Sequence, residues 1–203
     1  MALGKQAKVL TSAQVRTTLQ FLTTTRNPKR DTVMFLLSMK AGFRAKEIAT
    51  VTWAMLTDSE GQIADVIELQ DFASKGKGGR SIPMNKELKS ALVELLDEDR
   101  SAFEGRGYKF NLDRNVISSE RGSSMSANSV VHWFKRLYAN LGFEGCSSHS
   151  GRRSAITAWS RGVVKAGGSL RDVQSLAGHS SLALTQLYID QNADAKRLLV
   201  DMV

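Results

Sequence analysis

Apolar residues recur at intervals of three and four along most of this chain, a spacing typical of amphipathic helices. The first such run predicts a helix over 12–24, with Thr11 as its N-cap. After the break at Asn27-Pro28, a second run predicts a well-buried helix that ends at Gly42. Similar runs predict the remaining helices, which we place at 45–51, 86–98, from Ser126 to about 141, 150–163, 169–177, 181–187 and 191–202.

The period changes to that of short strands between residues 52 and 84. Residues 66–69 and 80–83 have strand character, and the glycine-rich stretch 75–79 (KGKGG) between them indicates a hairpin turn. Residues 101–125 show no regular period. The pattern therefore predicts a mainly α protein with a small antiparallel β-sheet, an α+β fold.

The length of 203 residues and the hydrophobic content of 42% suit one domain of ordinary size. We expect a single domain over 1–203, with an N-terminal arm at 1–10 and a C-terminal tail helix at 189–203. The apolar side of that tail could pack on its own domain or on a neighbouring protomer. With no long apolar run and a lone Cys146, we expect a soluble cytoplasmic protein without an internal disulfide or a cysteine zinc site.

The formal net charge of +8 favours a polyanionic partner such as nucleic acid. Residues 1–30 and 145–171 contain several lysines and arginines but no acidic residue, whereas acids gather elsewhere, as at 97–99. This separation of charge indicates one basic face. A solvated basic surface without a specific ligand remains an alternative.

Cleaving a phosphodiester without a metal requires a nucleophile, a nearby base, cations for the phosphate and an acid for the leaving oxygen. Arg44 and Arg152 are candidates for the cations, because a guanidinium stays charged and donates paired hydrogen bonds to phosphate. Taken alone, each is more typical of an ordinary exposed surface arginine. Glu47 lies one helical turn after Arg44, so it could form a simple ion pair or orient Arg44 for function.

The remaining candidates are a lysine, two histidines and a tyrosine. Lys75 begins the glycine-rich turn, where its ammonium could reach a leaving oxygen or simply be solvated. His149 and His179 could be structural histidines, and zinc binding is disfavoured because no acid or cysteine lies at ligand spacing. Tyr188 could belong to the core, or become a nucleophile beside a base or cations.

Taken together and in order, four sequence blocks resemble the tyrosine recombinase family, which includes the phage integrases. The blocks are 41–48 (AGFRAKEI), 74–83 (SKGKGGRSIP), 149–153 (HSGRR) and 177–188 (AGHSSLALTQLY). The resemblance covers the chain from about residue 10. It departs from the family at Gly151, where leucine is common, and at Ile189-Asp190 after the tyrosine. No separate core-binding domain is evident, so the chain could be complete or a catalytic fragment.

The resemblance assigns a role to each candidate residue. Arg44 and Arg152 would bind the scissile phosphate, and Lys75 would protonate the 5′ oxygen. His149 would accept the proton of Tyr188, and His179 would hydrogen-bond a nonbridging oxygen. Tyr188 would attack phosphorus to give a 3′-phosphotyrosine link, without metal, cofactor or ATP. We also expect DNA contacts from a further group of basic residues, namely Lys77, Arg80 and Arg153.

The resemblance also implies partners and leaves alternative functions open. The expected partner is a double-stranded DNA attachment site, bound by a protein that is monomeric in solution and tetrameric on paired sites. Accessory DNA-bending or directionality factors are further expected partners. The alternatives are a type IB topoisomerase, a hairpin resolvase, or a DNA-binding regulator that keeps the fold but does not cut.

Overall fold

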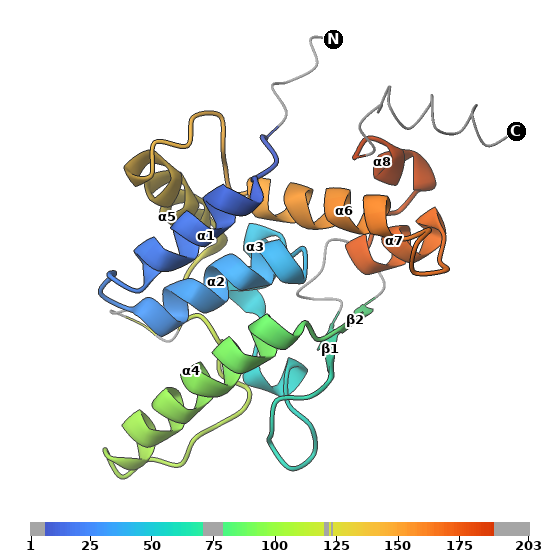
Figure 1. Ribbon diagram of the computed structural model, residues 1–203. Coiled ribbons are helices and arrows are strands. Elements are labelled where there is room, and N and C mark those ends of the chain that lie inside the picture. The colour runs from blue at the N-terminus through green and yellow to red at the C-terminus, as the bar shows by residue number, and fades with distance from the viewer. Residues whose placement is uncertain (1–6, 71–78, 120–121, 123, 189–203) are drawn as a thin grey trace, which may run out of the picture. The chain divides into compact units, whose positions relative to one another are not determined.

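The computed structural model describes residues 7–70, 79–119, 122 and 124–188 (Figure 1). By its internal contacts the chain divides into two compact units, Met1–Ala155 and Ile156–Val203. The boundary between them falls within one helix, α6 (Ser150–Gly162). Within the described residues, no helix is long and apolar enough to cross a membrane.

The core of the first unit forms around α2. The helices of this unit before α6 are α1 (Ser12–Leu22), α2 (Pro28–Lys40), α3 (Ala45–Thr50), the short 3₁₀ helix η1 (Trp53–Met55), α4 (Lys86–Glu104) and α5 (Ala127–Asn140). The α2 helix packs against α1, α3 and α4, and α3 packs against α5. Five consecutive α2 residues from Val33 to Leu37 are buried, so this helix lies inside the unit.

The predicted helix starts are confirmed by side-chain caps. Thr11 forms the expected capping box with Gln14, and the Ser126 hydroxyl accepts from the backbone N–H of Ser129. The ends differ more. The first helix ends at Leu22, two residues before the predicted end. The hydroxyl of Thr23, the next residue, donates to the backbone carbonyl of Gln20.

The fourth helix is six residues longer than the predicted range of 86–98. Its last turns carry charged residues and Phe103, which packs edge-on against Phe110 with ring centroids 5.7 Å apart. The guanidinium of Arg114 lies 4.2 Å from the centre of the Phe103 ring. These contacts come from residues beyond the helix, so the apolar period alone did not indicate them.

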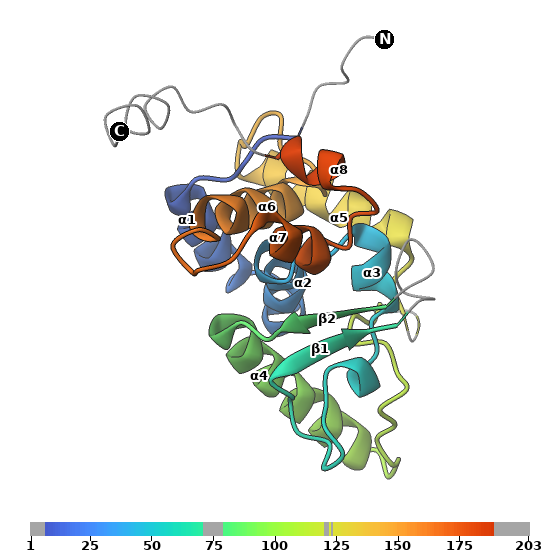
Figure 2. The same cartoon turned by 90° about the vertical axis from the view of Figure 1, so that its right-hand side faces the viewer.

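The predicted strands form the hairpin sheet of the first unit (Figure 2). Strand β1 (Val66–Leu69) pairs antiparallel with β2 (Arg80–Pro83), and Leu69 lies opposite Arg80. Glycine is required just before β2, because a Cβ on Gly79 would lie 2.5 Å from the Leu69 carbonyl oxygen. The predicted turn at 75–79 lies outside the described residues, apart from Gly79 itself.

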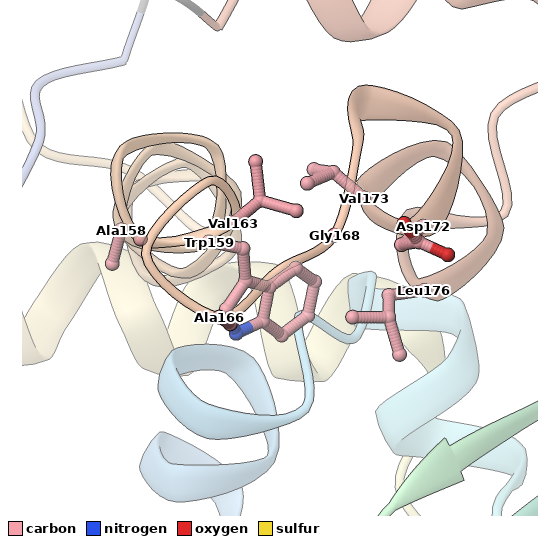
Figure 3. Close-up of a pocket in the computed structure, with 9 residues that line it drawn as sticks. Ala158, Trp159, Val163, Ala166, Gly168, Asp172, Val173 and Leu176 are labelled. Carbon is pink, nitrogen blue, oxygen red and sulfur yellow. The ribbon is translucent and has the colours of Figure 1, made fainter.

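The second unit contains the remainder of α6, then α7 (Leu170–Ala177) and α8 (Leu182–Gln186). Its small core consists of Ile156, Val173 and Ala177. Next to this core, a cavity of about 490 Å³ opens between the end of α6 and α7 (Figure 3). Its lining is mostly apolar, with Trp159 and Leu176 among the larger side chains.

Candidate functional site

Arg44 is held in place by Glu47, as the sequence spacing predicts. Gly42 has a left-handed backbone, with φ at 65°, that ends α2, and Arg44 then precedes α3. The backbone N–H of Arg44 donates to Oε2 of Glu47 at 2.7 Å, and its Nη1 donates to Oε1 at 2.8 Å. One carboxylate therefore fixes both the backbone and the guanidinium of Arg44, whose side chain is 23% exposed.

Glu47 binds a second arginine as well. The Nη1 and Nη2 atoms of Arg80 donate to the two Glu47 oxygens at 3.0 and 2.9 Å, in the paired geometry of a strong ion pair. Burial by itself would raise the pKa of Glu47, but the positive charge of Arg80 and the N–H of Arg44 outweigh it. The pKa of Glu47 is lowered overall, so this buried carboxylate is ionised at neutral pH.

Arg80, which we expected to contact DNA, is buried in the structure. Its side chain is only 6% exposed, and its guanidinium lies on Glu47 and 5.8 Å from the centre of the Phe43 ring. The pattern of alternation in β2 carried this information, since Arg80 is on the same buried face as Ile82. Arg80 is thus a structural partner of Glu47 instead of a surface cation.

Arg152 lies close to the loop that carries Arg44. It is 3% exposed on α6, and its Nη1 donates to the backbone carbonyl of Gly42. This hydrogen bond joins residues 110 positions apart in the sequence. The structure therefore brings the two arginines of the predicted phosphate clamp to the same part of the first unit.

His149 lies just before α6, and its backbone carbonyl accepts from the N–H of Arg153 at 2.8 Å. The pKa of His149 is lowered, first because nearby protein atoms partly desolvate the imidazolium and then because Arg152 and Arg44 repel its charge. By surface area the residue is still exposed. An accessible imidazole that is neutral at pH 7 has the properties of a proton acceptor.

The glycine that departs from the family pattern has a packing reason. A Cβ on Gly151 would lie 2.4 Å from the hydroxyl oxygen of Ser38 on α2. The beginning of α6 thus approaches α2 too closely for a larger residue at position 151.

His179 and Tyr188 lie together within the second unit. Gly178 ends α7 in the left-handed conformation, and after the short α8 the chain returns Tyr188 to His179. The two rings stack with their centroids 5.2 Å apart and their planes at 26°. Tyr188 is partly buried and packs against the core of this unit, including Ile156.

Two threonines near these rings were not predicted from the sequence. The side chain of Thr185 is fully buried, and its Oγ1 lies 3.0 Å from Nδ1 of His179. The hydroxyl of Thr157 donates to the backbone carbonyl of Tyr188 at 3.4 Å. Both are polar residues on helices, which periodicity assigns to no particular role.

The structure does not place every predicted residue. Lys75 and Lys77 lie outside the described residues, so their assignments remain predictions. Arg153 is partly buried on α6. Within the described part of the chain, no three histidine, cysteine or acidic side chains lie close enough together to hold a metal ion.

Comparison with known proteins gives consistent matches. The model of the phage integrase family matches residues 8–195. Tyrosine recombinase XerC of Herpetosiphon aurantiacus is 26% identical over 189 residues, which cover 92% of this chain and 57% of that protein. Tyrosine recombinase XerA of Thermococcus kodakarensis is 30% identical over 181 residues, which cover 89% of this chain and 57% of that protein. The chain spans about half to three fifths of the length of such relatives.

Solved structures show the same fold. A crystal structure of XerA recombinase matches 96% of this chain and 64% of its own, with a TM-score of 0.72 at 20% identity. The Tn1549 transposon integrase in complex with a circular intermediate DNA matches 98% of this chain and 67% of its own, also with a TM-score of 0.72 at 20% identity. The predicted mainly helical fold with a small antiparallel sheet is confirmed.

Proposed function

The chain belongs to the phage integrase family, and from this membership we propose that it is a site-specific DNA recombinase. It cleaves and rejoins DNA through a 3′-phosphotyrosine intermediate at Tyr188. The observation that carries the proposal is the state of His149, an exposed imidazole whose pKa is lowered beside two arginines that are themselves held by other groups.

The arginines supply the phosphate site. Glu47 holds Arg44 and the Gly42 carbonyl holds Arg152 before any DNA is bound. Cations fixed in advance stabilise the charge that develops on a phosphate in the transition state, because little reorganisation is needed during the reaction. A lysine in place of either arginine would lose the paired hydrogen bonds of a guanidinium.

The proton transfers follow from the remaining residues. His149 takes the proton of the Tyr188 hydroxyl, and the phenolate oxygen attacks phosphorus. The bond between phosphorus and the 5′ oxygen breaks, and Lys75 supplies a proton to that oxygen. His179 donates a hydrogen bond to a nonbridging oxygen. We assign both groups of residues to the same phosphodiester on the strength of the four family blocks.

The intermediate preserves the energy of the phosphodiester. A 5′ hydroxyl gives its proton back to Lys75 and attacks the phosphotyrosine, the bond from phosphorus to Tyr188 breaks, and the protonated His149 returns a proton to the Tyr188 oxygen. If the attacking strand comes from another duplex, the outcome is recombination. Neither ATP nor a metal enters these steps.

The proposed partner is a double-stranded DNA attachment site, bound by a monomer that assembles into a tetramer on paired sites. Lys77 and Arg153 contact the DNA backbone in this proposal. The net charge of +8 supports it, because lysine and arginine side chains that bind DNA phosphates release the counterions condensed on the DNA. The affinity should therefore fall steeply with salt. Accessory factors that bend DNA or set direction would act on this assembly.

A covalent trapping experiment tests the proposal. Duplexes that the protein binds are first selected from a randomised pool, then nicked so that cleavage releases a short fragment and prevents religation. On a denaturing gel, wild-type protein should form a covalent adduct that Tyr188→Phe does not form. Arg152→Ala should also lose the adduct while keeping most of its nonspecific DNA affinity.

The possible outcomes separate the alternatives. A protein that binds its selected DNA specifically and never forms an adduct is a regulator, and the enzyme proposal is then wrong. An adduct that leads only to relaxed circles indicates a topoisomerase, whereas exchanged strands indicate a recombinase.

A further inference from the structure

Thr185 connects His179 and Tyr188 within the second unit. Its hydroxyl oxygen lies 3.0 Å from Nδ1 of His179, and its backbone carbonyl accepts from the N–H of Tyr188 at 3.0 Å. The side chain is fully buried, so water does not compete for the hydroxyl. Thr185 can therefore control the orientation of the His179 ring.

The orientation of His179 is restricted on several sides. Its backbone N–H donates to the carbonyl of Gln174, and its backbone carbonyl accepts from the side chain of Gln174, each at 3.1 Å. The face of its ring stacks on Tyr188. With the backbone and the ring face held, the hydrogen bond to Thr185 fixes the rotation of the imidazole, so that Nδ1 faces Thr185.

The chemistry of imidazole then determines where the proton must be. A neutral imidazole has one nitrogen that donates and one that accepts. A nonbridging phosphate oxygen only accepts, so the nitrogen that binds it has to carry a proton. Since Nδ1 is bound to Thr185, this contact falls to Nε2. Nδ1 is then the acceptor, and the hydroxyl of Thr185 is its donor.

We propose that Thr185 is a positioning residue that holds His179 in the tautomer with its proton on Nε2, oriented for a phosphate oxygen. This inference rests on the proposed function, because it assumes that His179 binds the scissile phosphate. Thr185 itself does not touch DNA. It acts through His179 by donating to Nδ1.

Two substitutions separate the hydroxyl from the shape of the side chain. Thr185→Val keeps a branched side chain of similar size without the hydroxyl, and Thr185→Ser keeps the hydroxyl. With nicked duplexes selected as above, Thr185→Val should form the covalent adduct on the order of 10- to 100-fold more slowly, by analogy with the loss of a hydrogen bond that orients a metal-binding histidine. Thr185→Ser should stay within about threefold of wild type, and both variants should bind DNA with unchanged affinity.

A spectroscopic measurement distinguishes positioning from a general structural role. In ¹⁵N NMR spectra of the DNA-free protein at pH 8, the wild-type His179 should show the Nε2–H tautomer, and Thr185→Val should show a mixture. A wild-type His179 with its proton on Nδ1 would overturn the proposal, as would a folded Thr185→Val protein that cleaves at the wild-type rate. If wild-type protein forms no adduct, the proposed function fails, but the NMR spectra still test the hydrogen bond.

Discussion

Replacing Glu47 with glutamine removes one negative charge from between two arginines. Glu47 is 1% exposed and Arg80 is 6% exposed, so the substitution leaves a largely buried guanidinium without its carboxylate. Removing one partner of a buried ion pair typically costs about 3–5 kcal/mol. We expect about 3 kcal/mol here, because the amide oxygen still accepts one hydrogen bond and Arg44 is partly solvated.

Urea unfolding followed by circular dichroism measures this loss at pH 7. Glu47→Gln should unfold at a lower urea concentration with an unchanged dependence on urea, which identifies a change in stability and not in the unfolded chain. Asp65→Asn is the matched control, since Asp65 forms an exposed ion pair with Lys89 at 2.6 Å. That substitution should leave the urea midpoint close to that of wild type, because exposed ion pairs contribute little to stability.

The dependence on pH gives a second check on Glu47. Its pKa is lowered in the folded protein, so its charge stabilises the fold above the unfolded-state pKa of about 4.3. This stabilisation disappears as the pH falls through the lower, folded-state pKa. The difference between wild type and Glu47→Gln should therefore shrink under acidic conditions. Equal stability at pH 7, or a difference that stays constant down to pH 2, would refute the reasoning.

Three further predictions concern other described residues. Gly151→Ala should cost about 1–3 kcal/mol of stability and so lower the thermal midpoint, because its Cβ would meet Ser38. Gly162→Ala is its control, since a Cβ there has no atom within 4 Å; equal midpoints for the two variants would contradict the packing. Burial raises the pKa of Asp99 to about 6, so the stability of the wild-type protein should fall as the pH rises from 4 to 6. Asp99→Asn should abolish that fall and be about 2 kcal/mol more stable than wild type at pH 7, whereas parallel stability profiles would contradict the prediction. Because the pKa of His149 is lowered, the single-turnover cleavage rate should rise with pH with a midpoint below about pH 6.5; a midpoint above this value would exclude His149 as the base.

Features set by neighbouring residues in the sequence were predictable. Apolar spacing and the caps Thr11 and Ser126 located helix starts to within a residue, because a cap acts on the turn that follows it. The two paired strands also followed from local pattern, since both have the predicted bounds. Helix ends such as that of α4 depended on contacts with residues further along the chain.

The residues that hold the candidate site were less accessible to sequence reasoning. The family blocks indicated Arg44 and Arg152, but not the Gly42 carbonyl that binds Arg152 from 110 positions away. Likewise, the partnership of Glu47 with Arg80 spans 33 positions and turned an expected DNA contact into a buried ion pair. Such partners meet only through tertiary packing, which neither helical nor strand periodicity records.

Mapping the covalent bond to DNA tests the central claim most directly. The chain contains three tyrosines, of which Tyr108 is 65% exposed and Tyr138 is buried. After wild-type protein is trapped on nicked DNA, protease and nuclease digestion followed by mass spectrometry locates the modified residue. The account predicts a phosphodiester from Tyr188 to a 3′ end of the DNA. A bond to Tyr108 or to any other residue, or a link to a 5′ end, would contradict it.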